Sequence, residues 1–199
     1  MNRSQTMASH SDRSTPPTIQ RAIDVDALAV LSDAELDAAE DDGVLGGNQH
    51  YQDLQACTVD DLRFALRQER ALLDQFAQVA DSAEAETLVN ADRPPDDERH
   101  ALWHLDIGVV SAVLAVVALG GHAVLSCNGG AFGGVHAFST PQVRFYLADA
   151  SPDLLLRLAE GAGIGLTQED GLVVLYGRST AEFWKFACLA LNSLEPAPC

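Results

Sequence analysis

Lysine is almost absent from this chain, and basic residues of any kind are scarce. Lys185 is the single lysine, and the 12 basic residues face 29 acidic ones, for a net charge of −17. Direct binding to nucleic acid needs clustered Lys or Arg to neutralise phosphates and is therefore not expected. Binding to an anionic membrane surface is disfavoured for the same reason. Low lysine and abundant alanine suggest a bacterial genome rich in G and C, or a salt-adapted source.

Paired cysteines, a signal peptide and a membrane-spanning run are also missing. The four cysteines form no CxxC pair, so neither a disulfide framework nor a structural zinc site is expected. Residues 1–21 lack the apolar core of a signal peptide. The uncharged run 107–148 is interrupted only by Arg144 and broken by glycines, so its helical part is too short to cross a bilayer. We expect a soluble, cytoplasmic protein with reduced thiols.

Composition divides the chain into four parts. Residues 1–24 are rich in Ser, Thr, Arg and Pro and are predicted to be a disordered tail. Residues 25–90 form an acidic helical region, and the polar, proline-broken segment 91–99 is predicted to be a linker. Residues 100–195 are predicted to form an α+β domain with a glycine-rich loop at 126–136.

Two helices are expected within residues 25–90. Ser32 and Glu35 have the spacing of a capping box, and Thr58 is a favourable N-cap for a second, longer helix. That second helix carries an apolar stripe at helical spacing, made of Leu62, Leu66, Leu73, Phe76 and Ala80. Packing of the stripe within the chain is the favoured interpretation, and docking on a partner protein is the alternative.

The α+β domain is predicted to be a two-layer α/β sandwich with the order α-β-β-α-β-β-α and a mostly antiparallel sheet. Its first helix is apolar around nearly the whole circumference, which is typical of a buried helix. Apolar periodicity and turn residues place the helices at 101–119, after Ser151 and after the N-cap Thr180, and the strands at 122–127, 142–147, 164–167 and 172–176.

The loop 126–136 reads SCNGGAFGGVH and is the candidate ligand site. Its glycines permit positive φ and close approach of a ligand to the backbone. It lacks the lysine of a GxxxxGK[ST] phosphate loop, and no GxGxxG stands between a strand and a helix, so a standard nucleotide fold is disfavoured. The candidate ligand contacts in this loop are Ser126, Asn128, Gly129, Gly130, Gly133 and Gly134.

Cys127 and His136 are the candidate catalytic residues because they flank the glycine loop. Cys127 would be a nucleophile and His136 its base, with the loop amides forming an anion cradle or an oxyanion hole. The alternative is a buried structural cysteine beside a bend, since cysteine is among the most frequently buried residues.

His104 and Asp106 lie near the start of the buried helix and complete the set of candidate ligand contacts. Asp106 is the only acidic residue within the hydrophobic stretch, so its carboxylate either caps a backbone amide or belongs to a functional site. A mixed cluster of Cys127, His136, His104 and Asp106 is conceivable for zinc. No HExxH or comparable signature surrounds these residues, however, so no metal is predicted and the cofactor is left open.

The segment Ser126-Cys127-x-Gly129, at the end of a strand that follows a helix, resembles a loop of the wybutosine-synthesis methyltransferase-like family. In that family the Ser-Cys-x-Gly loop lies next to the substrate and cofactor site. This chain departs from the family at Gly130, where a basic residue is expected, and its acidity fits tRNA poorly. The resemblance implies a ligand-facing role for Ser126, Cys127 and Asn128.

Two classes of function fit these observations. The favoured one is a small-ligand-binding or regulatory adaptor module that uses the loop 126–136, with residues 25–90 as the surface for a protein partner. The alternative is a cysteine-dependent enzyme built on Cys127 and His136.

Overall fold

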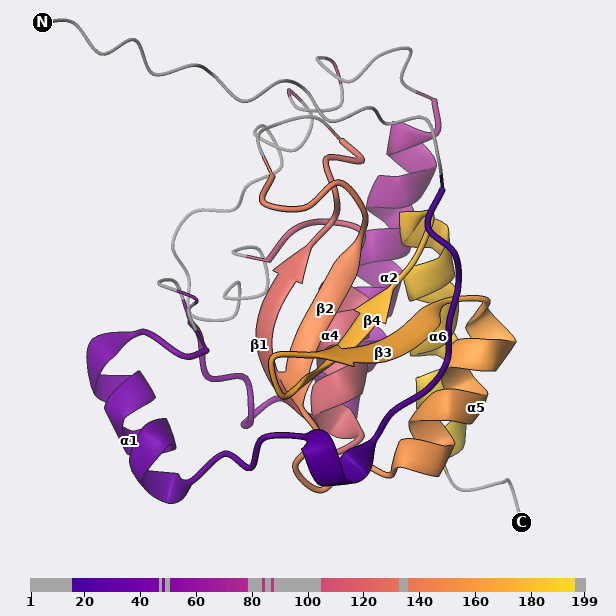
Figure 1. The fold of residues 1–199 in the computed structure, drawn as a ribbon. Helices are drawn as coiled ribbons and strands as arrows, with labels where there is room; N and C mark the ends of the chain where they lie inside the picture. Colours follow the sequence, from indigo (N-terminus) through magenta and orange to yellow (C-terminus); the bar gives the residue numbers. More distant parts are fainter. Residues whose placement is uncertain are drawn as a thin grey trace, which may run out of the picture.

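The C-terminal part of the chain has the predicted order of elements (Figure 1). A computed structural model describes residues 16–46, 48, 51–78, 84, 87, 105–132 and 136–195. From residue 110 onward the elements are α4 (Val110–Ala118), β1 (His122–Cys127), β2 (Gln142–Tyr146), α5 (Pro152–Ala162), β3 (Gly165–Glu169), β4 (Leu172–Tyr176) and α6 (Thr180–Leu194). The strands form one antiparallel sheet in the order β1-β2-β4-β3, which confirms the predicted α+β class.

Helices α4, α5 and α6 lie on one face of this sheet, and α2 (Val59–Phe76) packs against α4 and α6 on the same side (Figure 1). The apolar stripe of α2 is used within the chain, because Leu62 and Leu66 belong to the same buried core as Val113 of α4 and Phe183 of α6. The indole Nε1 of Trp184 also donates to the carbonyl of Leu66 at 3.2 Å. The helix that the sequence places in a separate acidic region thus shares its core with the α+β domain. The predicted linker 91–99 lies outside the described residues.

Local capping signals place the starts of the first two helices correctly. Ser32 and Glu35 form a capping box at the start of α1 (Asp33–Asp42), and Thr58 and Asp61 form another at the start of α2. The prediction for α6 is wrong by one residue, since Ser179 and not Thr180 is its N-cap.

Thr180 is the first residue inside α6, and its side chain is buried against Gly108. A Cβ atom on Gly108 would lie 2.4 Å from Cγ2 of Thr180, so the two residues are in close contact. The carboxylate of Glu182 instead accepts from the backbone N–H of Arg178 at 2.7 Å, just before the helix.

Segments from the N-terminal part of the chain lie along both edges of the sheet. Ala22 donates to the carbonyl of Leu166 in β3, and Leu166 donates to the carbonyl of Gln20, both at 2.9 Å. At the β1 edge, the side-chain amide of Asn48 donates to the carbonyl of Val124 at 2.8 Å. Such contacts cover strand edges that are otherwise open to pairing with another chain. Residues 20–24, which composition assigns to a disordered tail, therefore run beside β3.

The apolar helix α4 is shorter than predicted, although its burial is as expected. Every residue from Val110 to Val117 is buried, while residues 105–109 form turns before the helix and residues 101–104 lie outside the described part. Within the described ranges, none of the helices has the length and apolar character needed to cross a membrane.

Candidate functional site

A buried carboxylate from α2 fixes the turn that carries Asp106. The N-cap of α4 provides no side-chain hydrogen bond, and Glu69 supplies the missing acceptor. Glu69 is 3% exposed and accepts from the backbone N–H groups of Gly108, Val110 and Ser111 at 2.8, 2.9 and 3.1 Å, and from the Ser111 hydroxyl. Burial raises the pKa of Glu69, and the hydrogen bonds that it accepts oppose that rise. The turn at 105–109 is therefore held by the core.

Asn128 joins this turn to the glycine loop through two hydrogen bonds and makes a third within the loop. Its backbone N–H donates to Oδ2 of Asp106 at 3.1 Å, and its side-chain amide donates to the carbonyl of Ile107 at 3.0 Å. Its Oδ1 accepts from the backbone N–H of Gly130 at 2.9 Å. Asn128 is buried, so these contacts set the position of the loop relative to Asp106.

Gly129 allows the loop to turn sharply at the end of β1. Its φ is +67°, and a Cβ atom there would lie 2.6 Å from the backbone carbon of Thr140. An L-amino acid with a side chain is strained in this conformation and also clashes with the neighbouring backbone. The turn brings the N–H of Gly129 to 3.4 Å from the sulfur of Cys127.

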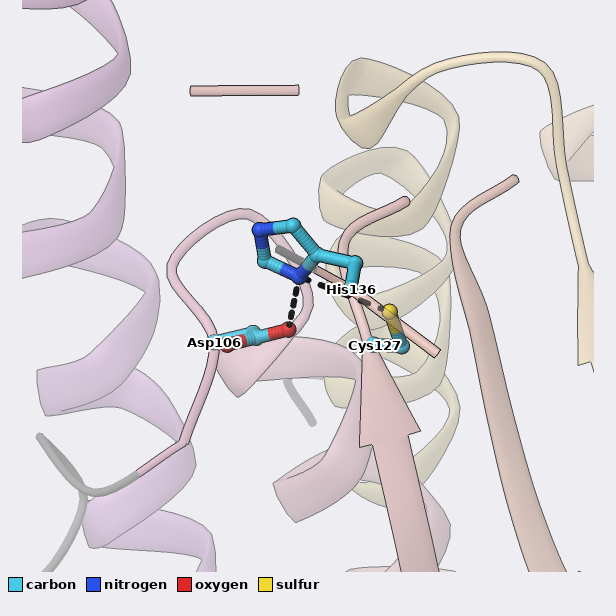
Figure 2. Close-up of side chains that lie close together, drawn as sticks. All are labelled: Asp106, Cys127 and His136. Carbon is cyan, nitrogen blue, oxygen red and sulfur yellow. Dashed lines mark hydrogen bonds and ion pairs between the residues drawn. The ribbon is translucent and has the colours of Figure 1, made fainter. Parts of the chain in front are cut away.

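Asp106, Cys127 and His136 converge from three segments of the chain, and Figure 2 shows their side chains pointing toward one another. Nδ1 of His136 lies 3.2 Å from Oδ2 of Asp106 and 3.6 Å from Sγ of Cys127. One donor atom from each residue lies within 4.8 Å of the other two. Cys127 is 4% exposed as the last residue of β1, whereas the Asp106 side chain keeps 36% of its surface exposed.

The surroundings of Cys127 favour the neutral thiol. Burial raises the pKa of Cys127, and the carboxylate of Asp106 raises it further. The backbone N–H groups of Gly129 and Phe138 stabilise the thiolate and act in the opposite direction without overcoming the rise. A reactive cysteine needs a depressed pKa, and these surroundings shift the pKa of Cys127 in the opposite direction.

The histidine geometry also differs from that of a catalytic triad. In a triad, one ring nitrogen of the histidine faces the nucleophile while the other faces the carboxylate. Here the same Nδ1 atom of His136 is the one near both Cys127 and Asp106. The three side chains therefore resemble ligands around a common point more than a proton-relay chain.

A cavity of about 220 Å³ lies beside this cluster, at the edge of β1. Its polar lining comes from Asn48, Gln52, Asp106 and Ser126, and its apolar lining includes Val113 of α4. Asp106 belongs to both the cavity wall and the side-chain cluster. Oε1 of Gln52 is buried and has no hydrogen-bond partner among the described residues.

The structure brings most of the predicted site residues together. Asp106, Cys127, Asn128, Gly129, Gly130 and His136 form one connected cluster, and Ser126 lines the adjacent cavity. His104, Gly133 and Gly134 lie outside the described residues.

Sequence reasoning missed Gln52 and Glu69. Glu69 had a recognisable signal, because a carboxylate stands at a buried position on the apolar side of α2, between Leu66 and Leu72. Gln52 lies in a polar turn-rich segment with no local pattern that distinguishes it from its neighbours.

Comparison with known proteins finds no relative on which this site can be mapped. No protein-family model matches the chain, and no curated protein or solved structure shows a significant match.

Proposed function

We propose that this protein binds a small polar molecule in the cavity beside the loop 126–136. The observation that supports this most directly is Gln52, a residue that lines the cavity and whose buried Oε1 atom has no partner in the described part of the chain. Buried polar atoms are nearly always hydrogen-bonded, because an unpaired one carries the full cost of its desolvation. A hydrogen-bond donor on a bound molecule supplies the missing partner when the side-chain amide of Gln52 turns toward the cavity.

The cavity chemistry favours a ligand that carries N–H donors. Gln52 and Asp106 both line the cavity and both carry acceptor oxygens, and the net charge of −17 attracts cations. The volume of about 220 Å³ is below the roughly 300–1,000 Å³ of pockets for drug-sized ligands. A small primary amine or amide meets both requirements.

A cysteine-dependent enzyme is the second candidate, and the 3.6 Å approach of Nδ1 of His136 to Sγ of Cys127 favours it. The raised pKa of Cys127 and the use of one nitrogen for both neighbours weigh against it. The resemblance of Ser126-Cys127-x-Gly129 to the wybutosine-synthesis methyltransferase-like family supports a ligand-facing loop under either candidate. A protein partner for residues 25–90 and a cytoplasmic location stay predictions.

Binding to the cavity is tested with a panel of small primary amines and amides, each added singly to the full chain. We expect one or more of them to raise the thermal midpoint and to shift the amide resonances of residues that line the cavity. Gln52→Leu should abolish both effects, because it removes the acceptor. The matched control Gln55→Leu changes an exposed glutamine of the same segment and should preserve them. The proposal fails if no member of the panel binds, or if Gln52→Leu binds equally well.

Alkylation with iodoacetamide at neutral pH separates the two candidates. Cys188 is the internal reference, because burial raises the pKa of both Cys127 and Cys188. The binding proposal predicts that Cys127 reacts no faster than Cys188. Selective, fast labelling of Cys127 that slows in His136→Ala would instead support the enzyme.

A further inference from the structure

We propose that Asp106, Cys127 and His136 form a binding site for a single divalent transition-metal ion, with Zn²⁺ as the best-fitting ion. This inference goes beyond the proposed cavity ligand and does not depend on it. It rests on the positions of three donor atoms, Oδ2, Sγ and Nδ1, which come from three different segments of the chain (Figure 2).

Two of the three separations between the donor atoms match tetrahedral coordination. With Zn–N and Zn–O bonds of about 2.0–2.2 Å and a Zn–S bond of about 2.3 Å, tetrahedral angles separate N from S by about 3.6 Å and N from O by about 3.4 Å. The observed separations are 3.6 Å between Nδ1 of His136 and Sγ of Cys127, and 3.2 Å between Nδ1 and Oδ2 of Asp106. The third pair, Sγ of Cys127 and Oδ2 of Asp106, lies within 4.8 Å, so one ion can contact all three atoms after an adjustment of the side chains.

The hydrogen bonds within the cluster centre on the carboxylate of Asp106. When Nδ1 of His136 carries a hydrogen, it donates to Oδ2 of Asp106, and the thiol of Cys127 donates to the same carboxylate. A divalent ion would take the place of these two hydrogens and contact all three donor atoms at once.

Backbone N–H groups support the donor atoms as they do in outer shells of metal sites. The N–H of Gly129 points at the sulfur of Cys127 at 3.4 Å, and the N–H of Asn128 donates to Oδ2 of Asp106 at 3.1 Å. Such outer contacts orient ligands and hold negative charge on them. The turn and the loop that present these groups are fixed by Glu69 and by the side chain of Asn128, so the donors are positioned before an ion arrives.

The set of donors selects the kind of metal. Thiolate and imidazole ligands suit zinc and similar transition metals, whereas Mg²⁺ and Ca²⁺ take oxygen ligands. Three protein ligands leave the fourth tetrahedral position to water or to a bound molecule, as in zinc sites that act on substrates. Because Asp106 also lines the cavity, the ion would lie at one end of it. Binding displaces the thiol proton of Cys127 into solvent, so affinity should increase with pH.

Cobalt(II) is the spectroscopic probe for this site. The full chain is stripped with a chelator, freed of it and titrated with Co²⁺. We expect saturation at one ion per chain, a thiolate-to-cobalt charge-transfer band, the visible bands of tetrahedral Co²⁺, and loss of all of them when Zn²⁺ is added. Cys127→Ser should lose the charge-transfer band, while the matched variant Cys188→Ser should keep it. His136→Gln and Asp106→Asn should each weaken binding at least about tenfold.

The proposal is overturned if the wild-type chain shows no charge-transfer band, or if the band survives in Cys127→Ser. Should Cys127→Ser fail to fold, alkylation of the wild-type chain decides: Zn²⁺ must slow the labelling of Cys127 and leave that of Cys188 unchanged. Equal labelling of Cys127 with and without Zn²⁺ refutes the site. Gln52→Leu should bind Co²⁺ normally, and chelated protein should still bind the amine or amide, so failure of either proposal is recognised separately.

Discussion

Replacing Glu69 by alanine should cause a large loss of stability for a single side chain. The substitution removes the acceptor of three backbone N–H groups and one hydroxyl at the start of α4, all of them buried. A buried donor left without a partner costs about 1–3 kcal/mol, so the three N–H groups alone set a loss of about 3 kcal/mol or more. The whole free energy of unfolding of a domain is about 5–15 kcal/mol. Glu69→Gln should lose less, because its amide keeps one acceptor oxygen.

Urea unfolding followed by circular dichroism measures this effect. With a slope of about 1–3 kcal/mol per molar urea, a loss of 3 kcal/mol lowers the midpoint by about 1–3 M. The matched control is Gln68→Ala, an exposed position next to Glu69 on the same helix, which should change the free energy of unfolding by less than about 0.5 kcal/mol. A Glu69→Ala variant as stable as Gln68→Ala would refute the assignment of Glu69 as the cap of α4.

Two further predictions concern β1 and the loop that follows it. Burial lowers the pKa of His122, whose ring is hydrogen-bonded to Tyr51 at 2.5 Å. The unfolded chain therefore takes up a proton first, and the free energy of unfolding should fall as pH drops below about 6.5. Unfolding titrations between about pH 5 and 7 should show a smaller change of this free energy with pH in His122→Gln than in wild type, and equal changes would contradict the prediction. Gly129→Ala should destabilise the chain more than Gly163→Ala. Both glycines have positive φ, but a Cβ atom at Gly129 also clashes with the backbone of Thr140. Equal urea midpoints for the two variants would argue against that clash.

Elements with strong local signals were predictable from the sequence. The capping boxes at Ser32 and Thr58 fix the starts of α1 and α2, and β1 has the predicted bounds of 122–127 because its apolar run ends at a glycine loop. The start of α4 was placed too early for a physical reason. Its cap comes from Glu69, a residue far away in the sequence, so no local pattern marks Val110 as the first helical residue.

The candidate site was predictable only in part. Cys127 and His136 were expected to approach each other across the glycine loop, and the structure places them 3.6 Å apart. The position of Asp106 beside these two residues depends on the hydrogen bonds that Asn128 makes to the turn 105–109. Such tertiary contacts leave no periodic pattern in the sequence. The cavity was not predictable, because Gln52 belongs to a segment whose sequence shows no periodicity or motif that would place it beside β1.

The two carboxylates near the turn 105–109 show how a structural acid is distinguished from a functional one. Glu69 is almost fully buried, and its four donors all belong to the turn and the first residues of α4, so it has no capacity left for a ligand. Asp106 keeps 36% of its side chain exposed and faces Cys127 and His136, which come from other segments. Since the first acid holds the turn on which the second is mounted, Glu69→Ala should weaken Co²⁺ binding even though Glu69 contacts no donor atom of the cluster. A Glu69→Ala variant that still folds and binds Co²⁺ like wild type would show instead that Asn128 alone positions Asp106.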